Sequence, residues 1–150
     1  MSLGNLLKIG QIKQHPSEPE EIERLLTAAR RNLGDARVTS ISTETRFDAA
    51  YKAIMQSALA ALMMHGYRPD TNRPGHHMTV VQSLPLTLGM NAKRVAVLDT
   101  LRRQRNATDY TGDLIDGSTT NNCIDEASRL LEDVLGWRKT NRPELIPDDN

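Results

Sequence analysis

The chain has 150 residues, a length that fits one domain and supports a buried core without disulfides or metals. Lysine and arginine together number 19, as do aspartate and glutamate, so the net charge is zero and no global field recruits nucleic acid or anionic membrane. Cys123 is the single cysteine, which excludes an internal disulfide or a thiolate metal cluster and favours a reducing, cytoplasmic compartment. We expect no membrane span, because no apolar run approaches ~20 residues. We expect no signal peptide, because the first residues lack its basic and apolar blocks.

The start of the chain predicts one short and one long helical segment. Aromatic residues make up only 3% of the chain, a composition that favours packed helices over sheets. Residues 1–16 are mildly apolar, and we expect a loosely docked helical turn or two there. Ser17 and Glu20 form a capping-box pattern with Pro19 in the first turn, which predicts a helix that ends near Gly34.

The middle of the chain predicts two further helices. The longer one spans about residues 44–65 and ends at Gly66. Its many alanines allow a neighbouring helix to approach closely. A loop follows, and then a helix over about residues 76–88 that Pro85 kinks or ends.

The last third of the chain predicts two helices and a tail. One helix spans about residues 91–110, and the other runs through Trp137. Three hydroxyl residues offer caps for this last helix: Ser118, Thr119 and Thr120. The tail, residues 141–150, contains two prolines and is expected to fray. No segment alternates with period two, so the sequence predicts an all-α fold, an antiparallel up-and-down bundle of about five helices with a four-helix core, over residues 17–140.

Two segments together are typical of a known superfamily. Residues 47–69 (FDAAYKAIMQSALAALMMHGYRP) predict an aromatic, Ala-rich helix that ends in a glycine. Residues 98–113 (LDTLRRQRNATDYTGD) centre on Arg105, which the polar Asn106 follows. In this order the two segments resemble the HEPN superfamily (the higher eukaryote and prokaryote nucleotide-binding domain), above all its small stand-alone bacterial and archaeal members. The resemblance covers about residues 20–138.

The resemblance implies a helical domain that forms homodimers, with the arginine motifs of both subunits meeting at the interface. In many members this groove is a metal-independent endoribonuclease, often the toxin of a toxin–antitoxin pair. Other members bind nucleotides or nucleic acid, or pair with a small nucleotidyltransferase. No cofactor and no metal is implied. The candidate binding residues are Arg105, Asn106, Asp109, Tyr110, Tyr51 and Arg102, of which Arg105 and Tyr110 are also the candidate catalytic residues.

The motif departs from the family at its histidine, because Tyr110, Thr111 and Gly112 occupy the window where that residue is expected. Metal-free cleavage of RNA requires an acid and a base, which histidine supplies near neutral pH, and positive charge, which arginine supplies. Tyrosine, with an ordinary pKa of about 10, is a poor base. The first interpretation is therefore a homodimeric domain that binds a nucleotide, RNA or a partner protein through Arg105 without cleaving it.

Two alternatives come from other functional classes. One is an active ribonuclease toxin that uses Arg105 with Tyr110 or with a histidine of the loop near residues 65–77, and that has an antitoxin protein as its partner. The other is a structural subunit that docks a small nucleotidyltransferase. A purely structural interpretation also competes for Arg105, because a pair with Asp109 one helical turn later would orient a core or dimer seam without any ligand.

Three histidines, His65, His76 and His77, flank one loop. No carboxylate or cysteine lies at ligand spacing from them, and adjacent histidines on a helix diverge by about 100°. We therefore expect capping, exposed or hydrogen-bonded core roles rather than a metal site. Tyr51 is expected to pack on the apolar side of its helix, with its hydroxyl directed toward a partner near the arginine motif.

Overall fold

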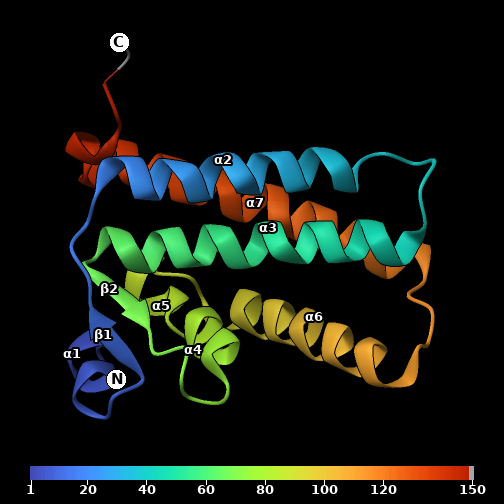
Figure 1. Cartoon of the computed structure of the whole chain (residues 1–150), viewed down its shortest axis with the longest axis horizontal. Coiled ribbons are helices and arrows are strands. Elements are labelled where there is room, and N and C mark those ends of the chain that lie inside the picture. The colour runs from blue at the N-terminus through green and yellow to red at the C-terminus, as the bar shows by residue number, and fades with distance from the viewer. Residues whose placement is uncertain (149–150) are drawn as a thin grey trace.

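The computed structural model describes residues 1–148 and is all-α apart from one short two-stranded sheet, as the sequence predicts. Helices α2 and α6 run in one direction, and α3 and α7 run in the opposite one (Figure 1). The four long helices are α2 (Pro19–Ala36), α3 (Thr43–Met64), α6 (Ala92–Thr111) and α7 (Gly117–Asn141). The short ones are α1 (Leu3–Lys8), α4 (His76–Gln82), α5 (Leu84–Leu88) and the 3-10 helix η1 (Pro143–Leu145). Within residues 1–148, no helix has both the length and the apolar character that crossing a membrane requires.

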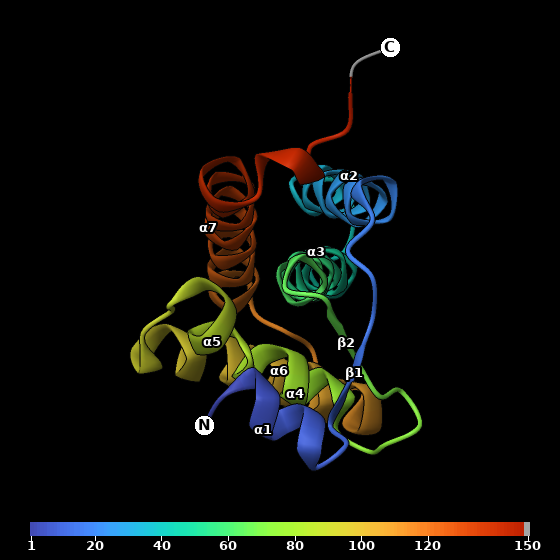
Figure 2. The ribbon, with the colours of Figure 1, turned by 90° about the vertical axis from the view of Figure 1, so that its left-hand side faces the viewer.

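Helix α3 lies at the centre of the fold, with α2 and α7 on one side and α4 and α6 on the other (Figure 2). Residues 60–64 are all buried, and five consecutive positions cover the whole circumference of a helix that has 3.6 residues per turn. A helix that is apolar all round belongs inside a protein. Its small side chains let the neighbouring helices approach closely: Ala50, Ala53, Ala58, Ala60 and Ala61 are each fully buried.

The N-terminal segment contains a strand that the sequence does not predict. Strand β1 (Ile12–Gln14) pairs antiparallel with β2 (Tyr67–Pro69), and Ile12 lies opposite Pro69. Ile12 is 1% exposed and packs with Leu6 and Leu62, so residues 1–16 are docked more firmly than expected. Three-residue strands are too short to show period two, and these partners are distant in sequence, which explains why the pattern alone does not reveal them.

The predicted capping box of α2 is wrong, although Pro19 does lie in the first turn. Glu18 is the N-cap residue and makes no side-chain cap bond. The Ser17 hydroxyl instead donates to the carbonyl of Met63, at 2.7 Å. A tertiary hydrogen bond thus takes the side chain that the local pattern assigned to the helix start. Helix α2 also continues past Gly34, which is exposed inside it.

The predicted N-cap of α7 is also wrong, because the N-cap residue is Asp116. The Asp116 carboxylate accepts from the backbone N–H of Thr119, at 2.7 Å, and this hydrogen bond lowers the pKa of Asp116. The helix begins at Gly117, so the predicted capping residues, Ser118, Thr119 and Thr120, all lie within its first turn. Aspartate is as good an N-cap as serine, and its position one residue before the glycine decides where the helix begins.

The tail differs from the frayed segment expected over residues 141–150. Leu145 in η1 is 3% exposed and belongs to the main core. Arg142 Nη1 donates to the carbonyl of Met64, at 2.8 Å. Residues 149 and 150 of that prediction lie outside the described residues. Two of the last carbonyls of α3, those of Met63 and Met64, thus accept hydrogen bonds from side chains at both ends of the chain.

Replacing Leu145 with alanine tests whether the tail is part of the core. We expect Leu145→Ala to lower the free energy of unfolding by roughly 2–3 kcal/mol, because it truncates a buried leucine. Ile146→Ala is the matched control: this neighbour is 40% exposed, and its truncation should change the free energy by less than about 0.5 kcal/mol. Urea denaturation followed by circular dichroism measures both values. Equal, small effects of the two substitutions would show that the tail does not dock.

Candidate functional site

Side chains from three helices meet around Arg105. The residues that form this arginine site are Asp48 and Tyr51 of α3, His77 of α4, and Arg105 and Asp109 of α6. Asp48 and Tyr51 are three residues apart and Arg105 and Asp109 are four apart, so each pair shares one face of its helix. The site therefore lies between the N-terminal half of α3 and the second half of α6.

The Arg105 guanidinium is held by a ring and by charge. It lies over the Tyr51 ring, with Cζ 5.0 Å from the ring centroid. Its nitrogens are 3.9 Å from the Asp48 carboxylate and 3.7 Å from the Asp109 carboxylate, too long for hydrogen bonds. The buried Nε has no hydrogen-bond partner among residues 1–148. The guanidinium of Arg105 is therefore held in place, but its N–H donors make no hydrogen bonds to these residues.

Arg102 shows the opposite arrangement on the same helix. Its Nε donates to the Asp99 carboxylate at 2.9 Å, and its side chain is 14% exposed. The same carboxylate is 3.0 Å from Nε of Arg103. Asp99 thus engages two neighbouring arginines. Of the arginines in the motif, Arg102 and Arg103 each contact Asp99 at 2.9–3.0 Å, whereas Arg105 makes no contact this short with a carboxylate.

The histidine of the arginine site contacts Tyr51. The Tyr51 hydroxyl is 3.2 Å from Nδ1 of His77, and the His76 ring packs edge-on against His77 at 4.7 Å. Gly75 precedes α4 with φ of 77°, a left-handed conformation that favours glycine, and both histidines follow it directly. The fold thus brings a loop histidine to Tyr51, where the sequence motif itself lacks one.

The pKa values of this pair are shifted so that both side chains are neutral near pH 7. Burial raises the pKa of Tyr51 to about 12, with Arg105 partly opposing the shift, so the hydroxyl keeps its proton at neutral pH. Burial, assisted by His76, Arg105 and Arg102, lowers the pKa of His77 below 6.5, so its imidazole is mainly neutral. When Tyr51 donates to Nδ1, the remaining proton of His77 lies on Nε2.

The carboxylate of Asp48 is the component of the site that the sequence analysis did not single out. Partial burial raises its pKa, Arg105 opposes this, and Asp109 adds to the rise. The side chains of Asp48 and Asp109 are 58% and 57% exposed, so water screens both from Arg105. The spacing of Asp48, one turn before Tyr51, was the available signal.

Two predicted site residues lie elsewhere. Helix α6 stays regular to Thr111, so Tyr110 is rotated by about 140° from Arg105 and its side chain is 92% exposed. Asn106 is also exposed and makes no side-chain hydrogen bond to the described residues. A single chain therefore brings Tyr51, Arg105 and Asp109 together but does not bring Tyr110 to them.

Metal and thiol chemistry have no support in this region. Across residues 1–148, no three His, Cys, Asp or Glu side chains are grouped so as to hold a metal ion. Cys123 is buried, and burial raises the pKa of its thiol to about 12, which keeps it protonated. A protonated thiol is a poor nucleophile. The chemistry of the arginine site rests on the guanidinium, the imidazole and the carboxylates.

No protein-family description matches the chain, and no curated protein matches it either. The resemblance to the HEPN superfamily therefore rests on the residues of α3 and α6. It stays a prediction.

Histidine titration tests the environment of His77. The pKa of His77 should lie below 6.5, and Arg105→Gln should raise it toward that value by removing a neighbouring positive charge. The pKa of His77 is lower in the folded chain than in the unfolded chain, so the unfolded chain binds the proton at a higher pH. The contribution of His77 to stability is therefore lost as the pH falls from 6.5 through the folded pKa.

The measurement is the pH dependence of the histidine ring signals by NMR. Arg103→Gln is the matched control, since this arginine is on the same helix, is 74% exposed and does not contribute to the shift of His77. Equal shifts in the two variants would contradict the close approach of Arg105 to His77.

Proposed function

We propose that the chain is a cytoplasmic, HEPN-like homodimeric domain that binds RNA through its phosphate groups at the arginine site. The observation that carries the proposal is the state of Arg105. Its guanidinium is positioned over Tyr51 at 5.0 Å but makes no hydrogen bond to the described residues. A planar fork of donors in this state matches the oxygens of a phosphate, and such charge-assisted bonds are strong.

The two carboxylates do not prevent phosphate binding. Asp48 and Asp109 are more than half exposed and lie 3.7–3.9 Å from Arg105, so these screened pairs contribute little free energy. A phosphate that forms direct hydrogen bonds replaces them at small cost. Because the net charge of the chain is zero, no chain-wide positive field adds to the affinity, and the proposal relies on this local arrangement.

The second half of α6 supports the homodimer. No residue of α6 after Leu101 is buried. Two large apolar side chains near its end are almost fully in solvent, Tyr110 at 92% and Leu114 at 82% exposed. A second copy that covered these two side chains would stabilise this end of the helix.

Direct binding of RNA tests the first proposal. Arg105→Ala should weaken binding of a fluorescein-labelled single-stranded RNA of mixed sequence by roughly tenfold to a hundredfold, the size of a charge-assisted hydrogen bond. Fluorescence anisotropy gives the Kd. Arg103→Ala is the control, because this side chain is 74% exposed and lies outside the site. If the two variants lose the same affinity, binding is non-specific and the arginine site is not the cause.

A second candidate function, metal-independent cleavage of RNA, is favoured by the position of His77. A neutral imidazole 3.2 Å from the Tyr51 hydroxyl and close to Arg105 has the state a general base requires. As the base it would use the tautomer in which Nδ1–H donates to the Tyr51 oxygen and Nε2 is free. Nε2 would take the proton of a 2′-hydroxyl, whose oxygen attacks the phosphorus and expels the 5′-oxygen, and the 5′-oxygen takes a proton from water. The products are a 2′,3′-cyclic phosphate and a 5′-hydroxyl, and Arg105 would stabilise the charge on the phosphorane.

Incubation with total RNA in a chelator separates the two candidates. If His77 is the base, His77→Gln should slow cleavage by about 10²–10⁴-fold while RNA binding is kept. His15→Gln is the control, because His15 pairs with Glu21 at 2.8 Å and lies outside the site. RNA that the wild type binds and leaves intact would reject the nuclease and keep the binding function.

A further inference from the structure

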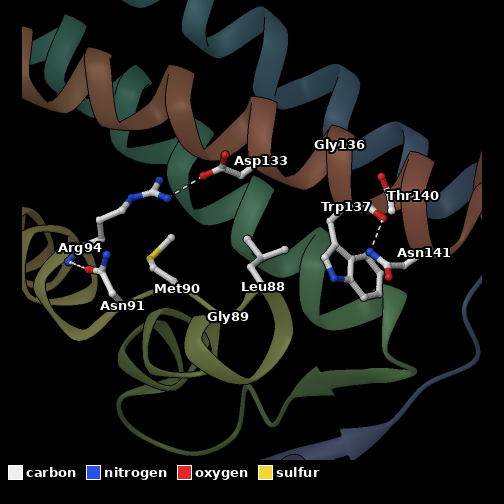
Figure 3. A pocket seen from close by; sticks show the side chains of 10 residues that line it. All are labelled: Leu88, Gly89, Met90, Asn91, Arg94, Asp133, Gly136, Trp137, Thr140 and Asn141. Carbon is white, nitrogen blue, oxygen red and sulfur yellow. Dashed lines mark hydrogen bonds and ion pairs between the residues drawn. The ribbon is translucent and has the colours of Figure 1, made fainter.

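A cavity of about 410 Å³ lies between α5, the start of α6 and the second half of α7 (Figure 3). It shares no residue with the arginine site. Arg94 in its wall and Arg105 are eleven residues apart on α6, which is about 16 Å along the helix. Its volume falls within the range of about 300–1,000 Å³ that small-molecule sites occupy. We call it the Trp137 cavity.

The wall of the Trp137 cavity has polar ends and an apolar middle. Figure 3 shows Asn91, Arg94 and Asp133 at one end and Trp137 at the other. Leu88 and Met90 lie between them. An apolar surface with a few polar groups at its edges is the usual chemistry of a site for a small organic ligand.

Trp137 is a fixed wall rather than a mobile side chain. The ring of His65 packs against its indole, with the ring centroids 4.7 Å apart and the planes tilted by 36°. His65 is itself held, because its Nε2 is 2.9 Å from the carbonyl of Thr87. A rigid aromatic wall binds a flat ring at low cost in conformational entropy.

Gly136 keeps the cavity open. It lies in the interior of α7 and lines the cavity, and no atom lies within 4 Å of where its Cβ would be. A glycine inside a helix costs about 1 kcal/mol relative to alanine, and here no close packing requires it. Any larger side chain at this position would occupy the cavity.

The charges in the wall cancel. Arg94 Nη1 donates to Asp133 Oδ2 at 2.7 Å, so the two charged groups form a neutral pair. The other carboxylate oxygen of Asp133 and the side-chain amide nitrogen of Asn91 have no hydrogen-bond partner in the described part of the chain. Nε and Nη2 of Arg94 are also buried without a hydrogen-bond partner in this part of the chain. The polar end therefore offers one acceptor, on Asp133, and donors from Asn91 and Arg94 without a net charge, which favours a neutral ligand with several acceptors and a donor on its edge.

We infer that the Trp137 cavity binds a neutral heteroaromatic ring of the nucleobase class. The ring packs against Trp137, Leu88 and Met90, and its edge hydrogen-bonds with Asp133 and Asn91 at the polar end. Such a ring could come from a free nucleoside or from a base of an RNA chain, and the chemistry that recognises it is the same. The inference does not depend on the arginine site.

The single tryptophan of the chain provides the readout, because it gives one indole N–H signal in a ¹⁵N-labelled sample. Adenosine, guanosine, cytidine, uridine and a short single-stranded RNA are titrated separately. A shift of the Trp137 signal with a nucleoside identifies a site for a free nucleoside, and a shift with RNA alone identifies a site for a base within RNA. No shift with any of the five probes would overturn the inference.

Filling the cavity supplies the decisive control. Gly136→Leu should weaken the binding that shifts the Trp137 signal by at least about tenfold. Gly34→Leu is the matched variant, since Gly34 is also an exposed helical glycine with nothing within 4 Å of its Cβ position, but on α2. Gly136→Ala adds one methyl group and should weaken binding by a smaller factor, which keeps the test valid if the leucine variant does not fold. Unchanged affinity in a folded Gly136 variant would overturn the inference.

Discussion

The close packing of helices around α3 is the constraint on which the rest of the structure depends. The C-terminal part of α3 is buried on every side, and the buried alanines along the helix let its neighbours approach closely. The polar groups of such a helix must then find partners in the elements that cover it. Two of the last carbonyls of α3, those of Met63 and Met64, receive hydrogen bonds from Ser17 and Arg142, which lie at opposite ends of the sequence.

The same constraint produces the arginine site. Tyr51 is the largest fully buried side chain of α3, and its hydroxyl is the polar end of an apolar body. The hydroxyl meets His77, and Arg105 covers the ring. Each of these contacts also changes the neighbour's chemistry, because burial keeps the tyrosine protonated and the imidazole neutral. Tyr51 is thus both a packed core residue of the central helix and the side chain that His77 and Arg105 contact.

The sequence predicts the long helices because their apolar spacing persists over many turns. It predicts the pairing of Arg105 with Asp109 for the same reason, since both residues lie on one helix. The cap of α7 and the end of α2 are local errors, whereas the errors at both ends of the chain concern contacts between distant segments. Ser17 matches a local capping pattern, yet its hydroxyl bonds to a carbonyl forty-six residues away, and no local pattern encodes that choice.

His77 shows the same limit at the site. The sequence places His77 beside a loop. Tyr110, five residues from Arg105, occupies the window where the histidine of the motif is expected, so the sequence favours Tyr110 as the site residue. The helix geometry turns Tyr110 away, while the fold of α4 against α3 and α6 brings His77 to Tyr51. Residues near each other in the chain are easy to group, but which face of α6 meets α4 depends on tertiary packing that periodicity does not specify.

The second half of α6 is held mainly by interactions within the helix itself. The hydroxyls of Thr108 and Thr111 donate to carbonyls one turn earlier, bonds that do not strengthen a helix. Arg105 pairs with Asp109 on the same helix. Pairs of this kind contribute only about 0.2–0.5 kcal/mol each, so a half-helix without buried side chains is marginal on its own. Under the proposed homodimer, a second copy supplies the burial that this half lacks. Arg105 lies on that half, so the stability of the site and the formation of the dimer would then be coupled.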